Sequence, residues 1–440
     1  MVRVLLAHSM LVACSLFATG ADLTDAPKPP AGFPRFKVQE IDSGLKIGYA
    51  VVTVDIDGDG KLDIVVADQH KIVWYQNPIW KKRVLLDGKT KPDNVCIAAI
   101  DIDGDKLPEL VVGAGWKPFD TKNAGTLQWL KRGKSLDDEW SVHAIPCDEP
   151  MVHRVKVADF DGDGKLEIIM APLMGRDATK EKNWMDGRPV RILAYPIPKD
   201  PTDAKAWRSE LISDDLHVVH NLDVTATPRM YKTGDVVEYE MFAASYEGIT
   251  HFIPRTKNPR FAGIGSALER TRSGDQSNPK GSRGSSEVTA VRMKSWPEFN
   301  WVAAVEPWHG NSVAFYEATG YQGADSPKGI RRTVVDDHLR WGHAIKFVDL
   351  DADDVQELIV GARDNPDPKQ GDSFTEKRGV RIYRHDAKTK KWERYILEDG
   401  GVAVEDLAVA DLNGDGKPDI IAVGRATGNC RIYWNQGVAK

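Results

Sequence analysis

Five copies of one acidic segment constrain the fold of this 440-residue chain more than any other feature. They read DIDGDGKLD at 55–63, DIDGDKLPE at 101–109, DFDGDGKLE at 159–167, DLDADDVQE at 349–357 and DLNGDGKPD at 411–419. An alternating apolar run precedes each copy and another follows it, which is the pattern of two antiparallel strands joined by a tight turn. A hairpin with an acidic turn is therefore the predicted core of each repeat.

Two more apolar segments recur behind these hairpins. The third segment reads KIVWYQN, TLQWLKR, VRILAYP, SVAFYE, VRIYRH or CRIYWNQ, and the fourth reads KRVLLDG, WSVHAIP, WRSELIS, RRTVVDD or ERYILED. Four strands per repeat indicate a propeller blade. The long interval between Asp159 and Asp349 has room for two hairpins without the acidic turn, at 220–246 and 287–307. These two make seven blades.

The last repeat has no outer strand of its own, whereas RFKVQEID at 35–42 resembles the outer strands of the other repeats. We therefore predict an all-β protein, a single seven-bladed β-propeller of four-stranded blades over residues 35–440. The N-terminal strand completes the last blade, so that no sheet edge stays open. A Pro-rich leader, residues 22–34, precedes the propeller.

Residues 1–21 are typical of an export signal, with Arg3 followed by an apolar stretch. Two processing routes stay open: cleavage at the small residues 19–21, or a lipobox ending at Cys14 that would add a lipid anchor. Both predict an extracytoplasmic protein that is periplasmic, secreted or anchored to the outer membrane. The stretch is too short for a transmembrane span.

The acidic turns have the composition of calcium sites. Carboxylates at positions one, three, five and nine can point at one centre, and Ca²⁺ prefers such oxygen ligands. We expect up to five structural calcium ions; an acidic turn without an ion is the alternative, although its carboxylates would repel one another. The predicted ligands are Asp55, Asp57, Asp59 and Asp63; Asp101, Asp103, Asp105 and Glu109; Asp159, Asp161, Asp163 and Glu167; Asp349, Asp351, Asp353 and Glu357; and Asp411, Asn413, Asp415 and Asp419.

The charge balance argues against a nucleic-acid partner. The chain has 59 Lys and Arg against 65 Asp and Glu, a formal net charge of -6, and no basic block. Nucleic-acid binding needs a clustered basic surface, so we expect none.

A second pattern lies six residues before the first aspartate of each turn. The seven repeats have Tyr49, Val95, His153, His220, Glu287, His343 and Glu405 at this position. Blade symmetry places these residues around one mouth of the central channel, opposite the acidic turns. Imidazoles gathered there can bind a transition metal, Zn²⁺ above all, with His153, His220 and His343 as the predicted ligands. The alternative is that the histidines hydrogen-bond neighbouring blades in a wet pore.

Loops on the same face add aromatic and polar side chains. Aromatic rings stack on sugar rings, and Arg or Asn side chains bind hydroxyl and carboxylate groups. Two insertions, 172–189 and 271–286, also reach this face, and either could cover a ligand. The predicted carbohydrate-binding residues are Trp116, Trp308, Asn311, Arg363 and Arg425.

The repeats resemble the FG-GAP/VCBS family of seven-bladed propellers. More narrowly, MVHRVKVADFDGDG, HVVHNLDV, EPWHGNSVAFYE and WGHAIKFVDLD are similar to the propeller domain of aldos-2-ulose dehydratases, enzymes that eliminate water beside a ketone. The resemblance implies metal-binding or proton-transferring roles for His153, His220, His309 and His343.

Together these features predict an exported, metal-dependent lyase or dehydratase that acts on a keto sugar or glycoside by β-elimination. A histidine or Tyr246 would take the proton. A non-catalytic, calcium-stabilised propeller that binds a glycan or a protein is the alternative, because propellers host both kinds of function.

Overall fold

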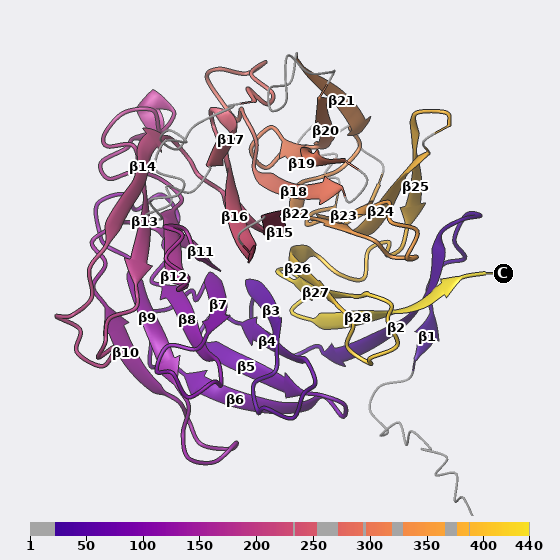
Figure 1. The fold of residues 1–440 in the computed structure, drawn as a ribbon. Helices are drawn as coiled ribbons and strands as arrows, with labels where there is room; N and C mark the ends of the chain where they lie inside the picture. The colour runs from indigo at the N-terminus through magenta and orange to yellow at the C-terminus, as the bar shows by residue number, and fades with distance from the viewer. Residues whose placement is uncertain are drawn as a thin grey trace, which may run out of the picture.

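Seven antiparallel sheets stand around a central axis as the blades of a propeller (Figure 1). The computed structural model describes residues 23–231, 234–252, 272–293, 296–318, 329–365, 376–386 and 388–439. The innermost strands of successive blades contact one another in a closed ring. This arrangement confirms the predicted all-β, seven-bladed fold. The predicted export signal, residues 1–21, lies outside the described residues.

The strands follow the predicted repeat order. Blade 1 contains β3 (Ala50–Val54), β4 (Asp63–Ala67), β5 (Lys71–Gln76) and β6 (Lys81–Asp87). Blade 2 contains β7 (Cys96–Ile100), β8 (Glu109–Ala114), β9 (Thr126–Lys131) and β10 (Ser141–Ile145). Blade 3 contains β11 (Val152–Ala158), β12 (Glu167–Pro172), β13 (Val190–Pro196) and β14 (Glu210–Leu216). A 3-10 helix, η1 (Lys180–Lys182), lies within the insertion 172–189.

Blade 4 contains β15 (Asn221–Tyr231), β16 (Gly234–Ser245) and β17 (Gly248–Phe252) among the described residues. Blade 5 contains β18 (Glu287–Met293), β19 (Trp296–Glu306), β20 (Ser312–Ala318) and β21 (Ile330–Asp336). Blade 6 contains β22 (Gly342–Val348), β23 (Glu357–Ala362), β24 (Gly379–Asp386) and β25 (Lys391–Ile396). Blade 7 contains β26 (Val404–Ala410), β27 (Asp419–Gly424), β28 (Cys430–Val438), β2 (Pro34–Asp42) and β1 (Thr24–Asp25).

The N-terminal strand closes the ring. β2 pairs antiparallel with β28, with Val38 opposite Tyr433. β1, from the Pro-rich leader, adds a fifth strand through the pair Thr24 and Val38. Closure by residues 35–42 is therefore as predicted, and the leader also takes part in the last blade.

The hydrophobic core lies between the blades. Second strands such as β4 and β8 are buried along their whole length, because each is covered on both faces by neighbouring blades. This burial explains the continuous apolar runs after each acidic turn. One cluster joins Val111 and Trp129 of blade 2 to Val155 of blade 3, so each blade depends on the next for its burial.

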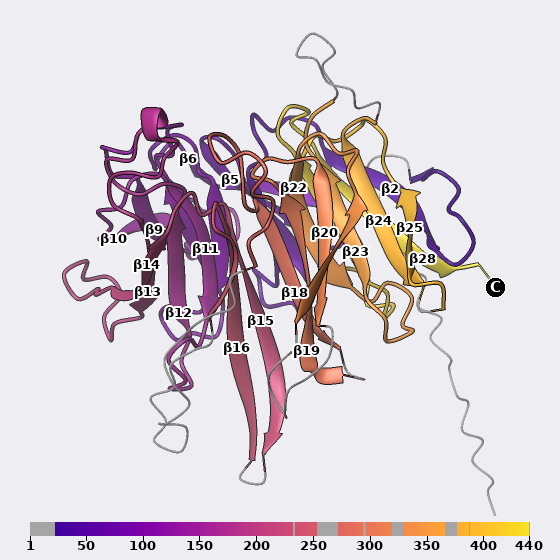
Figure 2. The same cartoon turned by 90° about the horizontal axis from the view of Figure 1, so that it is seen from above.

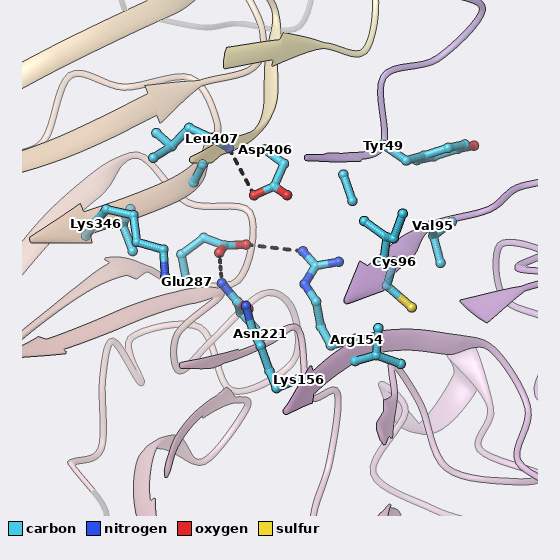
Figure 3. A pocket seen from close by; sticks show the side chains of 15 residues that line it. Tyr49, Val95, Cys96, Arg154, Lys156, Asn221, Glu287, Lys346, Asp406 and Leu407 are labelled. Atoms are coloured by element: carbon cyan, nitrogen blue, oxygen red, sulfur yellow. Dashed lines mark hydrogen bonds and ion pairs between the residues drawn. The ribbon is translucent and has the colours of Figure 1, made fainter. Parts of the chain in front are cut away.

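The central channel is narrow and polar. A cavity of about 40 Å³, enough for a water site, is lined by charged residues of several inner strands (Figure 3). The Lys346 Nζ lies 2.9 Å from an Asp223 oxygen, and the Arg154 Nη2 lies 3.7 Å from Glu287 Oε1. The channel therefore connects blades by ion pairs rather than by apolar packing.

Blades 4 and 5 depart from the other blades in shape. β15, β16 and β19 have 11, 12 and 11 residues, whereas inner strands β3 and β7 have five. The hairpin of β15 and β16 extends well beyond the other blades (Figure 2). It takes the place of an acidic turn.

Candidate metal centre

The residues six positions before each acidic turn form a buried ring at one mouth of the channel. All seven, Tyr49, Val95, His153, His220, Glu287, His343 and Glu405, are at most 6% exposed. Three of them, His153, His343 and Glu405, lie where the register between the first and second strands shifts. Such a bulge redirects a side chain relative to the regular strand. The bulges therefore help to aim these side chains at the mouth.

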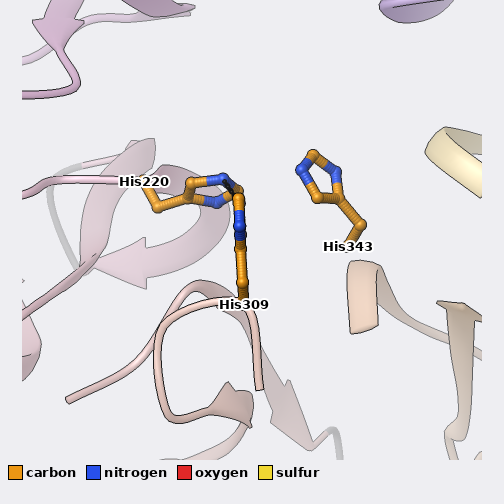
Figure 4. Close-up of side chains that lie close together, drawn as sticks. All are labelled: His220, His309 and His343. Carbon is orange, nitrogen blue, oxygen red and sulfur yellow. Dashed lines mark hydrogen bonds between the residues drawn. The ribbon is translucent and has the colours of Figure 1, made fainter. Parts of the chain in front are cut away.

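Three imidazoles converge at this mouth (Figure 4). One nitrogen each of His220, His309 and His343 lies within 4.8 Å of the other two. The Nε2 atoms of His220 and His309 are 3.0 Å apart, and the His220 and His343 ring centroids are 4.9 Å apart. Three imidazole ligands at this spacing match a catalytic zinc site, which leaves a further coordination position for a substrate.

The outer nitrogens of two imidazoles are fixed by oxygen acceptors. The Nδ1 of His220 lies 2.8 Å from Glu287 Oε1, and the Nδ1 of His343 lies 2.7 Å from the Glu405 carbonyl oxygen. A proton on each Nδ1 leaves the Nε2 lone pair free toward the centre. This is how metal-binding histidines are oriented in proteins.

His309 reaches the centre from the loop between β19 and β20. Its φ of 49° lies in the left-handed region, which costs energy for a residue other than glycine and is frequent at functional sites. Its ring lies between Trp308, with centroids 4.4 Å apart, and Trp341, with centroids 5.8 Å apart. The two indoles hold this imidazole in place.

Burial keeps the imidazoles neutral. The pKa values of His220, His309 and His343 lie well below 6.5, chiefly because burial disfavours the charged ring. A neutral imidazole is the form that binds a metal. The three residues therefore fit a transition metal such as Zn²⁺.

His153 lies beside this triad. Its ring centroid is 4.9 Å from that of His220, but its Nε2 faces the Arg154 guanidinium at 3.4 Å. Its buried Nδ1 has no hydrogen-bond partner. The geometric triad thus contains His309 where the sequence pattern predicted His153, and His153 keeps one nitrogen available to a ligand.

The acidic turns occupy the opposite ends of the inner strands. Asp55 caps its turn by accepting backbone hydrogen bonds from Gly58 at 2.8 Å and Gly60 at 2.9 Å. In three turns, three carboxylates each offer an oxygen within 4.8 Å of the others: Asp55, Asp57 and Asp63; Asp101, Asp103 and Glu109; and Asp159, Asp161 and Glu167. The turns thus have the geometry of oxygen-ligand sites.

The ninth residue of every turn is a buried carboxylate. Burial raises the pKa of Asp63 to about 6, of Glu109, Glu167 and Asp419 to about 7, and of Glu357 to about 8. One oxygen each of Glu109 and Glu357 lacks a hydrogen-bond partner. A buried carboxylate oxygen without a partner is costly, and a bound cation would satisfy it.

The turn of blade 6 keeps the backbone of the others although it lacks their glycines. Ala352 and Asp354 have φ values of 61° and 66°, close to the 76° of Gly58. Asp354 also donates its backbone N–H to Asp349, as Gly60 does to Asp55. The loss of the glycines therefore distorts this turn little, although its left-handed residues are strained.

Comparison with known proteins agrees with this architecture. An FG-GAP-like repeat model matches residues 55–112 and 349–422. These two parts of the seven-bladed propeller are therefore similar to FG-GAP-like repeats. A model of the β-propeller domain of aldos-2-ulose dehydratase matches residues 124–319, which include His153, His220 and His309. No curated protein gave a significant match.

Solved structures support the fold of this propeller. Two crystal structures of BBS1N in complex with ARL6DN, soaked with lead or mercury, align at TM-scores of 0.51 and 0.50. Their sequence identities are 15% and 14%; the alignments cover 96% and 93% of this chain and 99% of each of those chains. At such identities the likeness shows the fold alone.

The two insertions, 172–189 and 271–286, meet over one side of the mouth of the propeller. Asn183 Nδ2 donates to the Gly281 carbonyl oxygen at 3.0 Å, and Trp184 packs in one cluster with Tyr246 and, at its edge, Trp116 and Trp308. The insertions thus cover the aromatic side of the site.

The other residues that the sequence predicted for the site make the following contacts. Tyr246 packs against Trp308 at 5.8 Å between centroids, and burial raises its pKa to about 12. Asn311 Nδ2 donates to the Asp337 carbonyl oxygen at 2.8 Å, so it holds a neighbouring loop. Arg425 Nη1 contacts Glu405 at 2.5 Å, and Arg363 Nη1 lies 3.8 Å from the same carboxylate.

Proposed function

We propose that this propeller is a metal-dependent lyase of the dehydratase type that acts on a keto sugar or glycoside. The convergence of His220, His309 and His343 carries the proposal. The match of residues 124–319 to a dehydratase propeller domain supports it, because three of the four clustered histidines fall within that match.

A β-elimination fits the groups at the mouth. A neutral imidazole takes the proton next to the carbonyl; the C–H electrons form a C=C bond, and the β C–O bond breaks. The leaving oxygen accepts a proton from an acid and departs as water or an alcohol. His153, with its unpartnered Nδ1, is the imidazole available for proton transfer. A metal at the triad would supply Lewis-acid polarisation of the carbonyl.

We further propose that the acidic turns bind up to five structural calcium ions. The unpartnered oxygens of Glu109 and Glu357 and the crowding of carboxylates in each turn support this assignment. The protein would act after export, with the lipid anchor as one of its two processing routes. No helix in the described part of the chain has the length and hydropathy of a membrane span.

A calcium-stabilised propeller that binds a glycan without chemistry is the second candidate. The indoles at the mouth, Trp116 and Trp308, favour it because aromatic rings bind sugar rings with or without catalysis.

Elemental analysis and turnover separate the two candidates. Protein purified without a metal-binding tag should contain calcium and about one equivalent of a transition metal, and it should convert 2- or 3-keto sugars with a rise in enone absorbance. His220→Ala should abolish both the metal and the turnover, whereas His143→Ala, on outer strand β10, should change neither. Calcium alone, with tight binding of an unmodified glycan and no turnover, would establish the binding protein instead.

A further inference from the structure

The mouth around the triad has two chemically different sides. On the aromatic side, Trp116 lies 6.2 Å from His153 and Trp308 lies 4.4 Å from His309, measured between ring centroids. The indole Nε1 atoms of both tryptophans are buried and lack hydrogen-bond partners. Buried N–H donors without partners are rare in native proteins, so this side is suited to a ligand that carries acceptor oxygens.

The opposite side is cationic. The guanidinium carbons of Arg340 and Arg363 lie 5.0 and 5.2 Å from the centre of the Trp341 ring, and this ring in turn stacks on His309. Arg425 contacts the Glu405 carboxylate directly. Arg340, Arg363 and Arg425 thus lie close to the proposed ligands His309 and His343.

Arg363 is the guanidinium of this side that is positioned for a ligand. Arg425 Nη1 is 2.5 Å from one oxygen of Glu405, whereas Arg363 Nη1 remains 3.8 Å from the other oxygen, beyond hydrogen-bond distance. That second oxygen, Glu405 Oε2, has no hydrogen-bond partner. Glu405 therefore occupies Arg425 rather than Arg363. Arg363 donates its Nε–H to Asp364 Oδ2 at 3.0 Å, so its Nη groups are the part of the guanidinium that is positioned for a ligand.

The triad lies close to these positive groups. The Trp341 ring, which the guanidinium groups of Arg340 and Arg363 approach, lies 5.8 Å from the His309 ring, measured between centroids. Glu405, whose carboxylate lies 3.8 Å from Arg363 Nη1, also accepts a hydrogen bond from the His343 Nδ1 at its carbonyl oxygen, 2.7 Å away. A metal at the triad would add further positive charge, so an anionic group on the ligand would be stabilised at this mouth.

We propose that the sugar bound at this mouth carries a carboxylate, as a uronate or a keto acid does, and that Arg363 binds this carboxylate while the ring lies toward Trp308. A guanidinium binds a carboxylate through two parallel N–H groups, and the indole donors are available to the ring oxygens. The inference rests on the proposed sugar site and narrows it to acidic sugars.

Binding measurements test the proposal without depending on turnover. The full-length, metal-loaded protein is titrated with galacturonate and glucuronate, and with galactose and glucose, by following tryptophan fluorescence. We expect the uronates to bind at least about tenfold more tightly than the neutral sugars, and added salt to reduce this preference.

Variants assign the preference to one residue. Arg363→Gln should remove the preference for uronates without changing the affinity for neutral sugars, Arg363→Lys should retain part of it, and Arg331→Gln, on outer strand β21, should have no effect. Melting temperature and metal content are measured for each variant, so that misfolding is recognised. Equal binding of uronates and neutral sugars, or an unchanged preference in a folded Arg363→Gln protein, overturns the proposal.

The same experiment separates this inference from the proposed function. Turnover of neutral keto sugars with no preference for uronates would leave the lyase in place and remove the acidic substrate. A preference for uronates that depends on Arg363, in a protein without a transition metal, would remove the metal-dependent lyase and leave the acidic ligand in place.

Discussion

Blades 4 and 5 and the five blades with acidic turns perform different tasks within one ring. Blades 4 and 5 supply His220, Glu287 and His309 to the mouth and have long hairpins where the others have an acidic turn. The remaining blades supply every acidic turn. Blades 3 and 6 take part in both tasks, because they carry acidic turns and also supply His153 and His343. In these blades the histidine and the turn lie at opposite ends of the inner strand, so the proposed metal site and the proposed calcium sites share no ligand.

Removal of calcium should have the largest effect on stability, and it should act on the acidic-turn blades. An ion that binds only the folded chain contributes about 2.7 kcal/mol when its free concentration is one hundred times its Kd, and up to five sites act together. We expect protein that is stripped of metals with a chelator and then reloaded with the transition metal alone to melt many degrees below protein that also contains calcium. An unchanged melting temperature, in protein confirmed to be free of calcium, would contradict the structural role.

This calcium effect should grow as the pH rises from 5 to 8. Without an ion, the folded-state pKa values of the ninth carboxylates, about 6 for Asp63 and about 8 for Glu357, exceed the unfolded values near 4. Each carboxylate then favours the folded state while protonated, and this stability is lost as the pH rises through its folded pKa. Bound calcium offsets the loss of stability of the ionised carboxylates, so the difference in melting temperature between calcium-bound and calcium-free protein should widen as the pH rises. Melting curves with and without chelator at several pH values measure it.

His309→Ala should weaken the proposed metal site and leave the acidic turns unchanged, which is the reverse of calcium removal. It removes one ligand of the triad, so we expect metal affinity and turnover to fall by roughly a hundredfold or more, since even partners behind the ligands contribute 10–100-fold. The chelator-dependent change in melting temperature should stay as in the wild type. Retention of the transition metal would show that His309 is not a ligand.

Glu287→Gln should have a smaller effect on the same site. The amide keeps the size of the side chain but weakens the contact with the His220 Nδ1, now 2.8 Å, and we expect metal affinity to fall about 10–100-fold. Asp406→Asn, in the same channel but not bonded to the triad, is the control. Equal metal affinities for wild type and Glu287→Gln would remove Glu287 from the support of the site.

Asn77→Ala should have the smallest effect and concerns only the acidic-turn blades. The Asn77 Nδ2 donates to the Leu412 carbonyl oxygen in the turn of blade 7 at 2.7 Å, which ties neighbouring blades together. Loss of this bond should lower stability by about 1 kcal/mol without any change in the triad's metal content. Denaturant unfolding measures the first quantity and elemental analysis the second.

The sequence predicted the regular parts of the molecule well and the irregular parts less well. Repeated acidic turns and apolar runs were sufficient for seven blades and for closure by residues 35–42, because period-two alternation directly reflects burial. The same alternation gives no sign of the bulges at His153 and His343, which redirect side chains. The repeat position therefore identified the ring of residues but not which nitrogens converge.

Two site residues had weaker signals. His309 lies outside the repeated position, in the loop between β19 and β20, and only the family resemblance implied a metal-binding or proton-transferring role for it. Its φ of 49° depends on that loop and has no signal in the repeat. Trp341, which stacks on His309, was not singled out, although its place two residues before His343 and among arginines is visible in the sequence. Contacts between different blades cannot be read from one repeat at a time.

The pairing of β2 with β28 has a consequence for how the chain folds. Val38 meets Tyr433 in the last blade, so the contact that closes the ring joins segments near opposite ends of the chain. Contacts of such high sequence separation form late, after a large loss of chain entropy. The ring can close only after the last strand has been synthesised, and until then both strand edges are exposed to aggregation. If the protein is exported as proposed, this order of events would keep the ring open until its last strand is available on the far side of the membrane.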